Sequence, residues 1–329
     1  MKPANNRPIK INEVATRDGL QNEDRFVETA DKVALIDALS LSGYAKIEVT
    51  SFTSPKAIPA LRDAEAVMKQ IRRHPDLIYT ALVPNARGAE RALESCVDEF
   101  NVVMSVTDTH NLTNLRMTCE QSFAQLESVI RYAEKADVPV NVSLSCVFGC
   151  PMEGEVAPQV VQQWIDRFAA LPIAGITLCD TTGMAYPPQV TDIFETASEK
   201  HPSLPLCGHF HNTRGMGLIN AVAAIEAGAQ ALDTSLGGIG GCPYAPGATG
   251  NVATEDVVHM LECMGYQTGI DLNRLLLASK QLAELIGHDV PSQVSHAGPR
   301  TVKHPLPEDF DAIRAQAAAR PKTGRQPYA

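Results

Sequence analysis

Short apolar segments rich in β-branched residues alternate with longer amphipathic segments along most of the 329-residue chain. Eight such pairs follow one another, which favours an α/β fold whose parallel sheet closes into a (β/α)8 TIM barrel, with extra C-terminal helices. An open doubly wound sheet is the structural alternative. No G-x-G-x-x-G turn or P-loop follows the first apolar segment to favour that alternative.

The expected elements can be placed from their hydrophobic periodicities. Strands are predicted at Lys10–Ala15, Lys46–Ser51, Ile78–Val83, Phe100–Ser105, Val138–Ser145, Gly175–Asp180, Leu204–His211 and Ala231–Ser235. Helices are predicted at Ala30–Ser42, Lys56–Arg73, Ala86–Ser95, Cys119–Ala136, Pro158–Leu171, Pro187–Lys200, Met216–Ala227, Thr254–Met264 and Leu272–Ile286, with a short one at Asp309–Ala319.

The domain organisation follows from size and composition. With 44% hydrophobic and 20% charged residues, the chain can bury a large core, and α/β barrels of this size commonly form one domain. We therefore expect a single catalytic domain over residues 1–298, including a loop at 237–251. From about Pro299 the composition shifts to Lys, Arg, Pro, Ala and Gln, so residues 299–329 are expected to form a partly disordered tail.

The formal net charge of −10 gives no support for a nucleic-acid partner, and a polyanionic substrate would need a local positive patch or a metal. The N-terminus lacks the apolar core of a signal peptide, and no window approaches the ~18 apolar residues of a membrane span. The eight cysteines are scattered, mostly in apolar segments, as is typical of reduced thiols. These features predict a soluble cytoplasmic protein without a membrane partner.

Residues 237–251 read Gly-Gly-Ile-Gly-Gly-Cys-Pro-Tyr-Ala-Pro-Gly-Ala-Thr-Gly-Asn. Six glycines and two prolines in this stretch exclude a helix or an ordinary strand. Cys242 lies in its middle, Asn251 closes it, and a helix start follows. A Gly-rich loop that carries a thiol is typical of a lid that brings an acid or a nucleophile to a site. An ordinary solvent loop is the alternative.

The segment Cys-Gly-His-Phe-His-Asn-Thr ends an apolar run near residue 210. Because alternate residues of a strand face the same side, His209 and His211 project together, at a spacing able to bind one metal ion. Two histidines, a strand-end aspartate and an asparagine would form a mixed N/O set that suits Mg²⁺ or Mn²⁺, with Zn²⁺ or Co²⁺ possible. Histidines that only satisfy buried hydrogen bonds are the alternative.

In a TIM barrel, catalytic groups collect at the carboxyl ends of the strands. The polar residues singled out here share that position: Asp18 after the first predicted strand, Glu48 on the second, Asp180 ending the sixth, His209 and His211 ending the seventh, and Cys242 and Asn251 after the eighth. The barrel prediction therefore brings all of them to one rim.

Several motifs, in this order, resemble the 3-hydroxy-3-methylglutaryl-CoA (HMG-CoA) lyase family. They are Arg17-Asp-Gly-Leu-Gln-Asn-Glu, Ile47-Glu-Val-Thr-Ser-Phe-Thr-Ser-Pro-Lys56, Ser145-Cys-Val-Phe-Gly-Cys-Pro-Met-Glu-Gly154, Asp180-Thr-Thr-Gly, His209-Phe-His211 and Gly237–Asp256. The resemblance runs from about Lys10 to Ile286. Its Gly-Gly-Cys-Pro-Tyr-Ala segment is close to diagnostic of the lyases within a barrel group that also includes isopropylmalate- and homocitrate-synthase-like enzymes.

The resemblance implies a divalent cation, Mg²⁺ or Mn²⁺, held by Asp18, His209, His211 and Asn251. It also implies an acyl-CoA substrate, a 3-hydroxy-3-carboxymethyl acyl-CoA that is cleaved in a retro-Claisen step. For HMG-CoA the products would be acetyl-CoA and acetoacetate. A homodimer is implied as well.

The chemistry of that cleavage suggests roles for the matched residues. Arg17, rigid and permanently charged, is expected to bind the substrate and stabilise the enolate oxygen. Cys242 resembles the family's acid, which protonates the carbanion carbon, and His209 resembles its catalytic histidine. Glu48 and Asp180 match acidic rim residues expected to position Arg17, Cys242 or a water, or to relay protons. Structural hydrogen bonding alone is the alternative for both acids.

Two segments bear on the substrate. Arg214 stands where many lyases carry Tyr, so we expect it to meet a CoA phosphate or a substrate carboxylate, or to cap the following helix. The segment Asp108-Thr-His110-Asn111 resembles one in bacterial relatives, and His110 and Asn111 are expected to face the substrate. These departures leave a citramalyl-CoA or longer branched 3-hydroxyacyl-CoA lyase open. A condensing synthase and a catalytically silent barrel with structural zinc are the rival interpretations.

Overall fold

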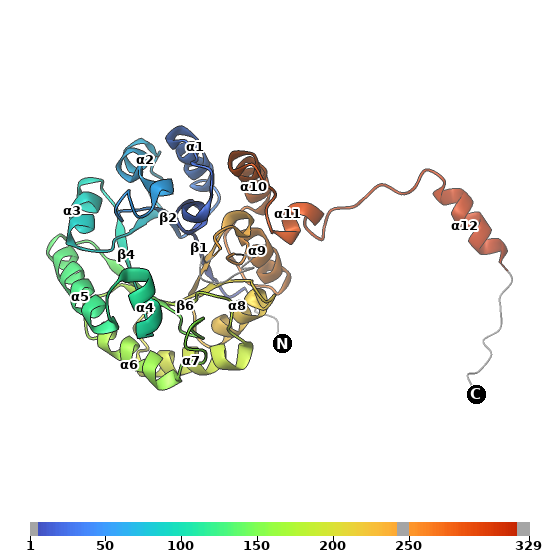
Figure 1. The fold of residues 1–329 in the computed structure, drawn as a ribbon. Coiled ribbons are helices and arrows are strands. Elements are labelled where there is room, and N and C mark those ends of the chain that lie inside the picture. Colours follow the sequence, from blue (N-terminus) through green and yellow to red (C-terminus); the bar gives the residue numbers. More distant parts are fainter. Residues whose placement is uncertain (1–5, 242–249, 321–329) are drawn as a thin grey trace, which may run out of the picture. The chain divides into compact units, whose positions relative to one another are not determined.

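The computed structural model describes residues 6–241 and 250–320, and its strands close into a barrel in the order β1 to β8 (Figure 1). Every neighbouring pair of strands is parallel, including β8 with β1. The predicted TIM barrel is thereby confirmed. The strands are β1 Lys10–Glu13, β2 Lys46–Ser51, β3 Ile78–Leu82, β4 Glu99–Ser105, β5 Val140–Ser145, β6 Gly175–Asp180, β7 Leu206–Phe210 and β8 Ala231–Thr234.

Helices surround the ring of strands (Figure 1). In the part of the chain that the structure describes, they are α1 Thr29–Leu39, α2 Ala64–Gln70, α3 Ala86–Glu94, α4 Asp108–Leu115, α5 Cys119–Lys135, α6 Pro158–Ala169, α7 Pro187–Lys200, α8 Gly217–Glu226, α9 Thr254–Cys263, α10 Leu272–Ile286 and α11 Gln293–Ala297. Buried apolar side chains of the strands and helices form one core cluster between the two layers.

The predicted helix at Lys56–Arg73 is wrong in its first half. Ile58 has a non-helical backbone (φ −127°, ψ 82°) because the proline that follows disfavours the helical conformation there. A single 3₁₀ turn, Pro59–Leu61, precedes α2. Two short helices, α4 and α11, were missed because neither shows a long apolar periodicity.

The chain divides into two units, Met1–Ala297 and Gly298–Ala329. The second unit contains α12, Phe310–Ala319, in which no residue is buried. Among the described residues, no helix combines the length and the apolar character that a bilayer crossing requires.

The barrel interior carries a polar network where branched apolar residues are usual. Asn101 on β4 accepts hydrogen bonds from the Asn141 amide (3.1 Å) and the Ser143 hydroxyl (2.9 Å) of β5. Its own Nδ2 donates to Glu48 Oε1 on β2 at 2.8 Å. The network therefore fixes one oxygen of Glu48 and leaves the other to face the mouth of the barrel.

A second carboxyl group, Glu13 at the end of β1, ties the loops at the mouth together. Its Oε1 accepts the backbone N–H groups of Ala15 (2.8 Å) and Leu236 (2.9 Å). Its Oε2 contacts the Tyr44 hydroxyl (2.5 Å) and the Thr254 hydroxyl (3.0 Å). Burial raises the pKa of Glu13 from 4.5 to about 7, against the lowering effect of these four hydrogen bonds.

We predict a pH-dependent stability contribution from Glu13. Its folded-state pKa lies above the unfolded value, so the folded state holds the extra proton between pH 4.5 and about 7. The free energy of unfolding should therefore fall by about 3 kcal/mol through this window as pH rises. Glu13→Gln, which removes the titrating proton and keeps an oxygen acceptor for the Ala15 and Leu236 N–H groups, should lack this fall. Urea unfolding at a series of pH values measures the difference.

The matched control is Glu65→Gln, because Glu65 is partly exposed, accepts from Arg91 at 2.6 Å and has a lowered pKa. That variant should keep the wild-type fall. Parallel stability curves for the wild type and Glu13→Gln between pH 4.5 and 7 would contradict the assignment.

Candidate active site

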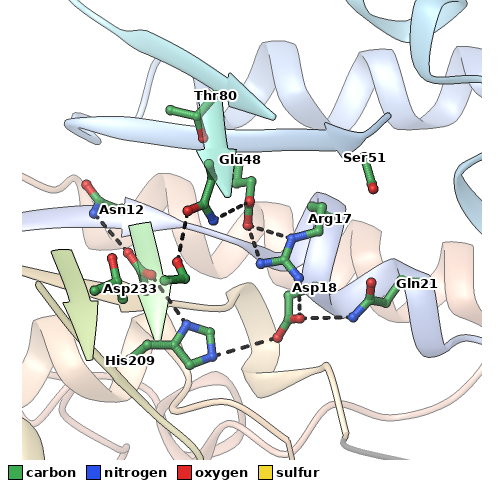
Figure 2. Close-up of polar contacts among 12 residues, drawn as sticks. Asn12, Arg17, Asp18, Gln21, Glu48, Ser51, Thr80, His209 and Asp233 are labelled. Carbon is green, nitrogen blue, oxygen red and sulfur yellow. Dashed lines mark hydrogen bonds and ion pairs between the residues drawn. The ribbon is translucent and has the colours of Figure 1, made fainter. Parts of the chain in front are cut away.

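The first side chains of the site come from a π-helical turn, Ala15–Gly19, directly after β1. The carbonyl of Val14 accepts the N–H groups of Arg17 (3.1 Å), Asp18 (2.7 Å) and Gly19 (3.3 Å). Such wide turns are frequent at functional sites. This one places the consecutive side chains of Arg17 and Asp18 together at the mouth of the barrel, where Figure 2 shows them in contact.

Arg17 is held between two carboxylates (Figure 2). Its Nε and Nη2 lie 2.6 Å and 2.5 Å from Glu48 Oε2, and its Nη1 lies 2.6 Å from Asp18 Oδ1. The side chain of Arg17 is nearly buried. Burial opposes its charge, but Glu48 and Asp18 raise the pKa of Arg17 above its ordinary value. The guanidinium is therefore a permanent cation with a fixed plane.

His209 on β7 and His211 just after it lie on the same side of the chain, as the sequence predicts. Their ring centroids are 5.4 Å apart. One ligand atom each from Asp18, His209 and His211 can be chosen so that all lie within 4.8 Å of one another. That spacing is short enough for one ion to reach all three.

Asn251 reaches the cluster because the end of the Gly-rich loop pairs with the end of β7. His211 and Asn251 form an antiparallel β-bridge, and the Asn212 N–H donates to the Gly250 carbonyl at 2.9 Å. The Asn251 amide donates to Asp18 Oδ2 at 2.8 Å. A Cβ on Gly240 (φ +108°) would lie 2.5 Å from that amide nitrogen, so this close approach requires glycine.

The donor set fits a divalent cation. His211 is buried, and its Nδ1 has no hydrogen-bond partner among the described residues. Burial, then the charge of His209, lower the pKa of His211 to about 4, which keeps the imidazole neutral as a metal ligand must be. Burial alone would raise the pKa of Asp18, but Arg17 and then the two histidines lower it to about 2. The cluster thus offers the anionic oxygen of Asp18 beside the neutral imidazole nitrogen of His211.

Asp233 on β8 is a site residue that the sequence analysis missed. Its Oδ2 lies 3.4 Å from His209 Nδ1, and its Oδ1 accepts from Asn12 Nδ2 at 2.9 Å (Figure 2). Its Oδ1 also accepts from Cys207 Sγ at 3.2 Å. His209 and Asp233 are also register partners in the sheet. A carboxylate on Nδ1 orients the ring and leaves Nε2 for the side that faces Asp18, 3.8 Å away.

Asp180 and Arg214 lie in a loop network next to the histidines. Both oxygens of Asp180 accept backbone N–H groups, from Met184 at 2.7 Å and Ala185 at 3.2 Å. Arg214 Nη1 donates to the carbonyls of Thr182 (3.0 Å) and Gly183 (2.8 Å) in the same β6–α7 loop. The structure brings neither side chain into a hydrogen bond with Arg17. The Arg214 side chain is exposed and fixed at one end of its guanidinium.

His110 and Asn111 are both buried on α4. Asn111 accepts from the Ser105 N–H (2.9 Å) and donates to the Ser122 hydroxyl (2.7 Å), and Ser105 Oγ lies 2.5 Å from His110 Nδ1. These bonds hold α4 against β4 and α5. A contact of either residue with substrate stays a prediction.

Cys242 lies outside the described residues, so its place relative to the cluster stays a prediction. The same holds for the central part of the proposed lid, residues 242–249.

The fold and this cluster define a class: a (β/α)8-barrel protein with a candidate divalent-cation centre and a buried arginine at the carboxyl rim. A family model described as HMGL-like matches residues 8–282. The chain belongs to this HMGL-like family.

Among its relatives, a hydroxymethylglutaryl-CoA lyase of Bacillus subtilis is 44% identical over 287 residues, which span 87% of this chain and 96% of the relative. The mitochondrial hydroxymethylglutaryl-CoA lyase of Homo sapiens is 37% identical, over 88% of this chain and 89% of the human protein. A structure of an HMG-CoA lyase from Acinetobacter baumannii, in complex with coenzyme A and 3-methylmalate, matches with a TM-score of 0.88 and 46% identity, over 93% of this chain and 100% of that one.

We predict that Asp233→Asn weakens Mn²⁺ binding about 10- to 100-fold, because the amide no longer anchors the His209 ring as a carboxylate does. Isothermal titration with Mn²⁺ measures the dissociation constant. Asp166→Asn is the matched control, since Asp166 accepts from His201 at 2.7 Å on the surface, and it should bind Mn²⁺ as the wild type does. An unchanged dissociation constant in Asp233→Asn would refute the orienting role.

Proposed function

We propose that the protein is a divalent-cation-dependent carbon–carbon lyase that cleaves HMG-CoA to acetyl-CoA and acetoacetate. The observation that carries this proposal is the convergence of Asp18, His209, His211 and Arg17 at one mouth of the barrel. The identity of the chain to curated HMG-CoA lyases over most of its length supports the substrate and the reaction.

In this cleavage the bond between C2 and C3 breaks, the C3 hydroxyl loses its proton, and the electron pair moves onto the thioester carbonyl. Arg17 is the residue that we assign to the resulting enolate oxygen. Glu48 and Asp18 hold its guanidinium before substrate arrives, so no reorganisation is needed as the negative charge develops.

Asp18, His209, His211 and Asn251 are the residues that would hold the cation, for which we propose Mg²⁺ or Mn²⁺. Once bound, such an ion lowers the pKa of a substrate hydroxyl and orients it. We propose His209 as the catalytic histidine that the family resemblance implies, with Asp233 fixing its ring through Nδ1. We assign Cys242 as the acid that delivers a proton to C2, as the family resemblance implies.

The lyase direction is favoured over a condensing synthase by the named relatives. For the acyl group, we propose that Arg214 meets a substrate carboxylate or a CoA phosphate with the guanidinium nitrogens that do not bind the β6–α7 loop. We further propose that the chemistry resides in a single catalytic domain, residues 1–298, and that the enzyme is a cytoplasmic homodimer.

The purified protein with Mg²⁺ or Mn²⁺ should cleave HMG-CoA in preference to citramalyl-CoA and to a longer branched 3-hydroxyacyl-CoA. Arg17→Met should lower kcat by at least about 10²–10³, because the enolate oxygen loses a fixed charged donor. A coupled assay for acetyl-CoA and acetoacetate measures both results.

Arg72→Met is the matched control, since the Arg72 side chain is 91% exposed, and its kcat should equal that of the wild type. Cleavage of none of the three esters would refute the lyase assignment. Near-normal turnover by Arg17→Met would remove that arginine from the mechanism.

A further inference from the structure

Asn101 is buried in the barrel interior, where its side chain meets that of Glu48. The two residues lie on alternate strands, β4 and β2, and inward side chains of alternate strands share layers in a TIM barrel. A cavity of about 240 Å³ opens beside both side chains. Because this space would let either side chain turn, hydrogen bonds rather than close packing decide how Glu48 points.

The neighbours of Asn101 determine the direction of its amide. Its Oδ1 accepts from Asn141 Nδ2 at 3.1 Å and from Ser143 Oγ at 2.9 Å. Its Nδ2 is thereby turned to Glu48 Oε1, 2.8 Å away. An ionised carboxylate can only accept hydrogen bonds, so a reversed amide would set two oxygens against each other. The two donors on β5 therefore orient Asn101, and Asn101 in turn binds one particular oxygen of Glu48.

This hydrogen bond leaves Glu48 a single oxygen for Arg17. Nε and Nη2 of Arg17 both contact Oε2, at 2.6 Å and 2.5 Å, while Nη1 pairs with Asp18 Oδ1 at 2.6 Å (Figure 2). An arginine frequently pairs instead with both oxygens of a carboxylate, through two parallel N–H groups. If Oε1 were released, Glu48 would be able to turn toward that arrangement and to rotate the guanidinium out of its present plane.

We propose that Asn101 is a positioning residue of the reaction, which acts through Glu48 to set the plane of the Arg17 guanidinium. The proposal rests on the proposed function, in which Arg17 meets the enolate oxygen. A preorganised donor must point at the place where the charge develops, and a displacement of about 1 Å can lower a rate about 10²-fold. Because the enolate charge develops only in the transition state, the effect of Asn101 should appear in kcat, with KM little changed.

The sharpest test exchanges the acid and the amide. In Glu48→Gln, the new amide must set a donor against either Asn101 Nδ2 or Arg17, and kcat for HMG-CoA should fall about 10²-fold. Adding Asn101→Asp to that variant restores every donor–acceptor pair. The carboxylate then accepts from its two donors on β5 and from the new amide, whose oxygen faces Arg17. The double variant should therefore regain at least about 10-fold in kcat over Glu48→Gln, with KM within about threefold of the wild type.

Asn101→Leu, which removes the donor at similar volume, should lower kcat at least about 10-fold with KM within about threefold. Asn273→Asp is the matched control, since Asn273 is exposed in the first turn of α10, and it should keep the wild-type constants. A double variant no faster than Glu48→Gln would overturn the proposal, as would a kcat of Asn101→Leu equal to that of the wild type. If Asn101→Leu does not fold, the comparison of the double variant with Glu48→Gln decides alone.

The NMR signal of the Arg17 Nε–H group, in protein labelled with isotopic arginine, gives a readout independent of turnover, and Arg17→Met identifies it. In Asn101→Leu the signal should move, and its proton should exchange with water at least about 10-fold faster, whereas Asn273→Asp should leave both unchanged. An unchanged signal in Asn101→Leu would overturn the proposal. If the wild type cleaves no ester, the proposed function fails, and this measurement still decides whether Asn101 positions Arg17.

Discussion

The carboxylate of Asp18 is the interaction on which the site depends. It contacts its sequence neighbour Arg17 and two residues that are distant in sequence, Asn251 after β8 and His209 on β7. Because Arg17 and the histidines keep its pKa near 2, it remains ionised in a largely buried place. The same group therefore fixes the guanidinium and presents a negative oxygen to the centre that the imidazoles line.

Four of the buried acids of the mouth fall into two electrostatic kinds, while Glu48 pairs with Arg17 and still has a raised pKa because burial outweighs the charge of that arginine. Asp18 and Asp233 contact cationic or imidazole groups, and each has a lowered pKa despite its burial. Glu13 accepts two backbone N–H groups and contacts two hydroxyl groups, and Asp180 accepts two backbone N–H groups. Burial raises the pKa of Glu13 to about 7 and that of Asp180 to about 6. The first kind lines the candidate cation centre, and the second kind binds the backbone of the loops beside it, while a catalytic role for Asp180 stays a prediction. This division explains how several carboxyl groups share one barrel mouth.

Much of the fold and the centre of the site could be predicted from the sequence. The alternation of apolar runs and helical patterns predicted the barrel, and the two-residue period of a strand predicted that His209 and His211 lie together. Asp233 was missed because a single acid inside a short apolar strand does not by itself indicate a site. Only the strand register, which pairs Asp233 with His209, shows its role.

Other features depend on tertiary contacts that no local pattern reveals. Asn111 accepts from the Ser105 N–H and donates to the Ser122 hydroxyl, partners that its motif did not reveal, and its predicted contact with substrate stays a prediction. The Asn251 position follows from a β-bridge to His211 directly after β7. A helical period read through Pro59 overestimated α2, because a proline there starts a 3₁₀ turn and leaves the preceding residue extended.

The most direct test of the central claim is a crystal structure of the protein grown with Mn²⁺, with the ion located by its anomalous scattering. The account predicts one strong peak per chain, within coordination distance of Asp18, His209 and His211, with Asn251 beside it. A peak at another place on the barrel, or saturating Mn²⁺ with no peak among these side chains, would contradict it.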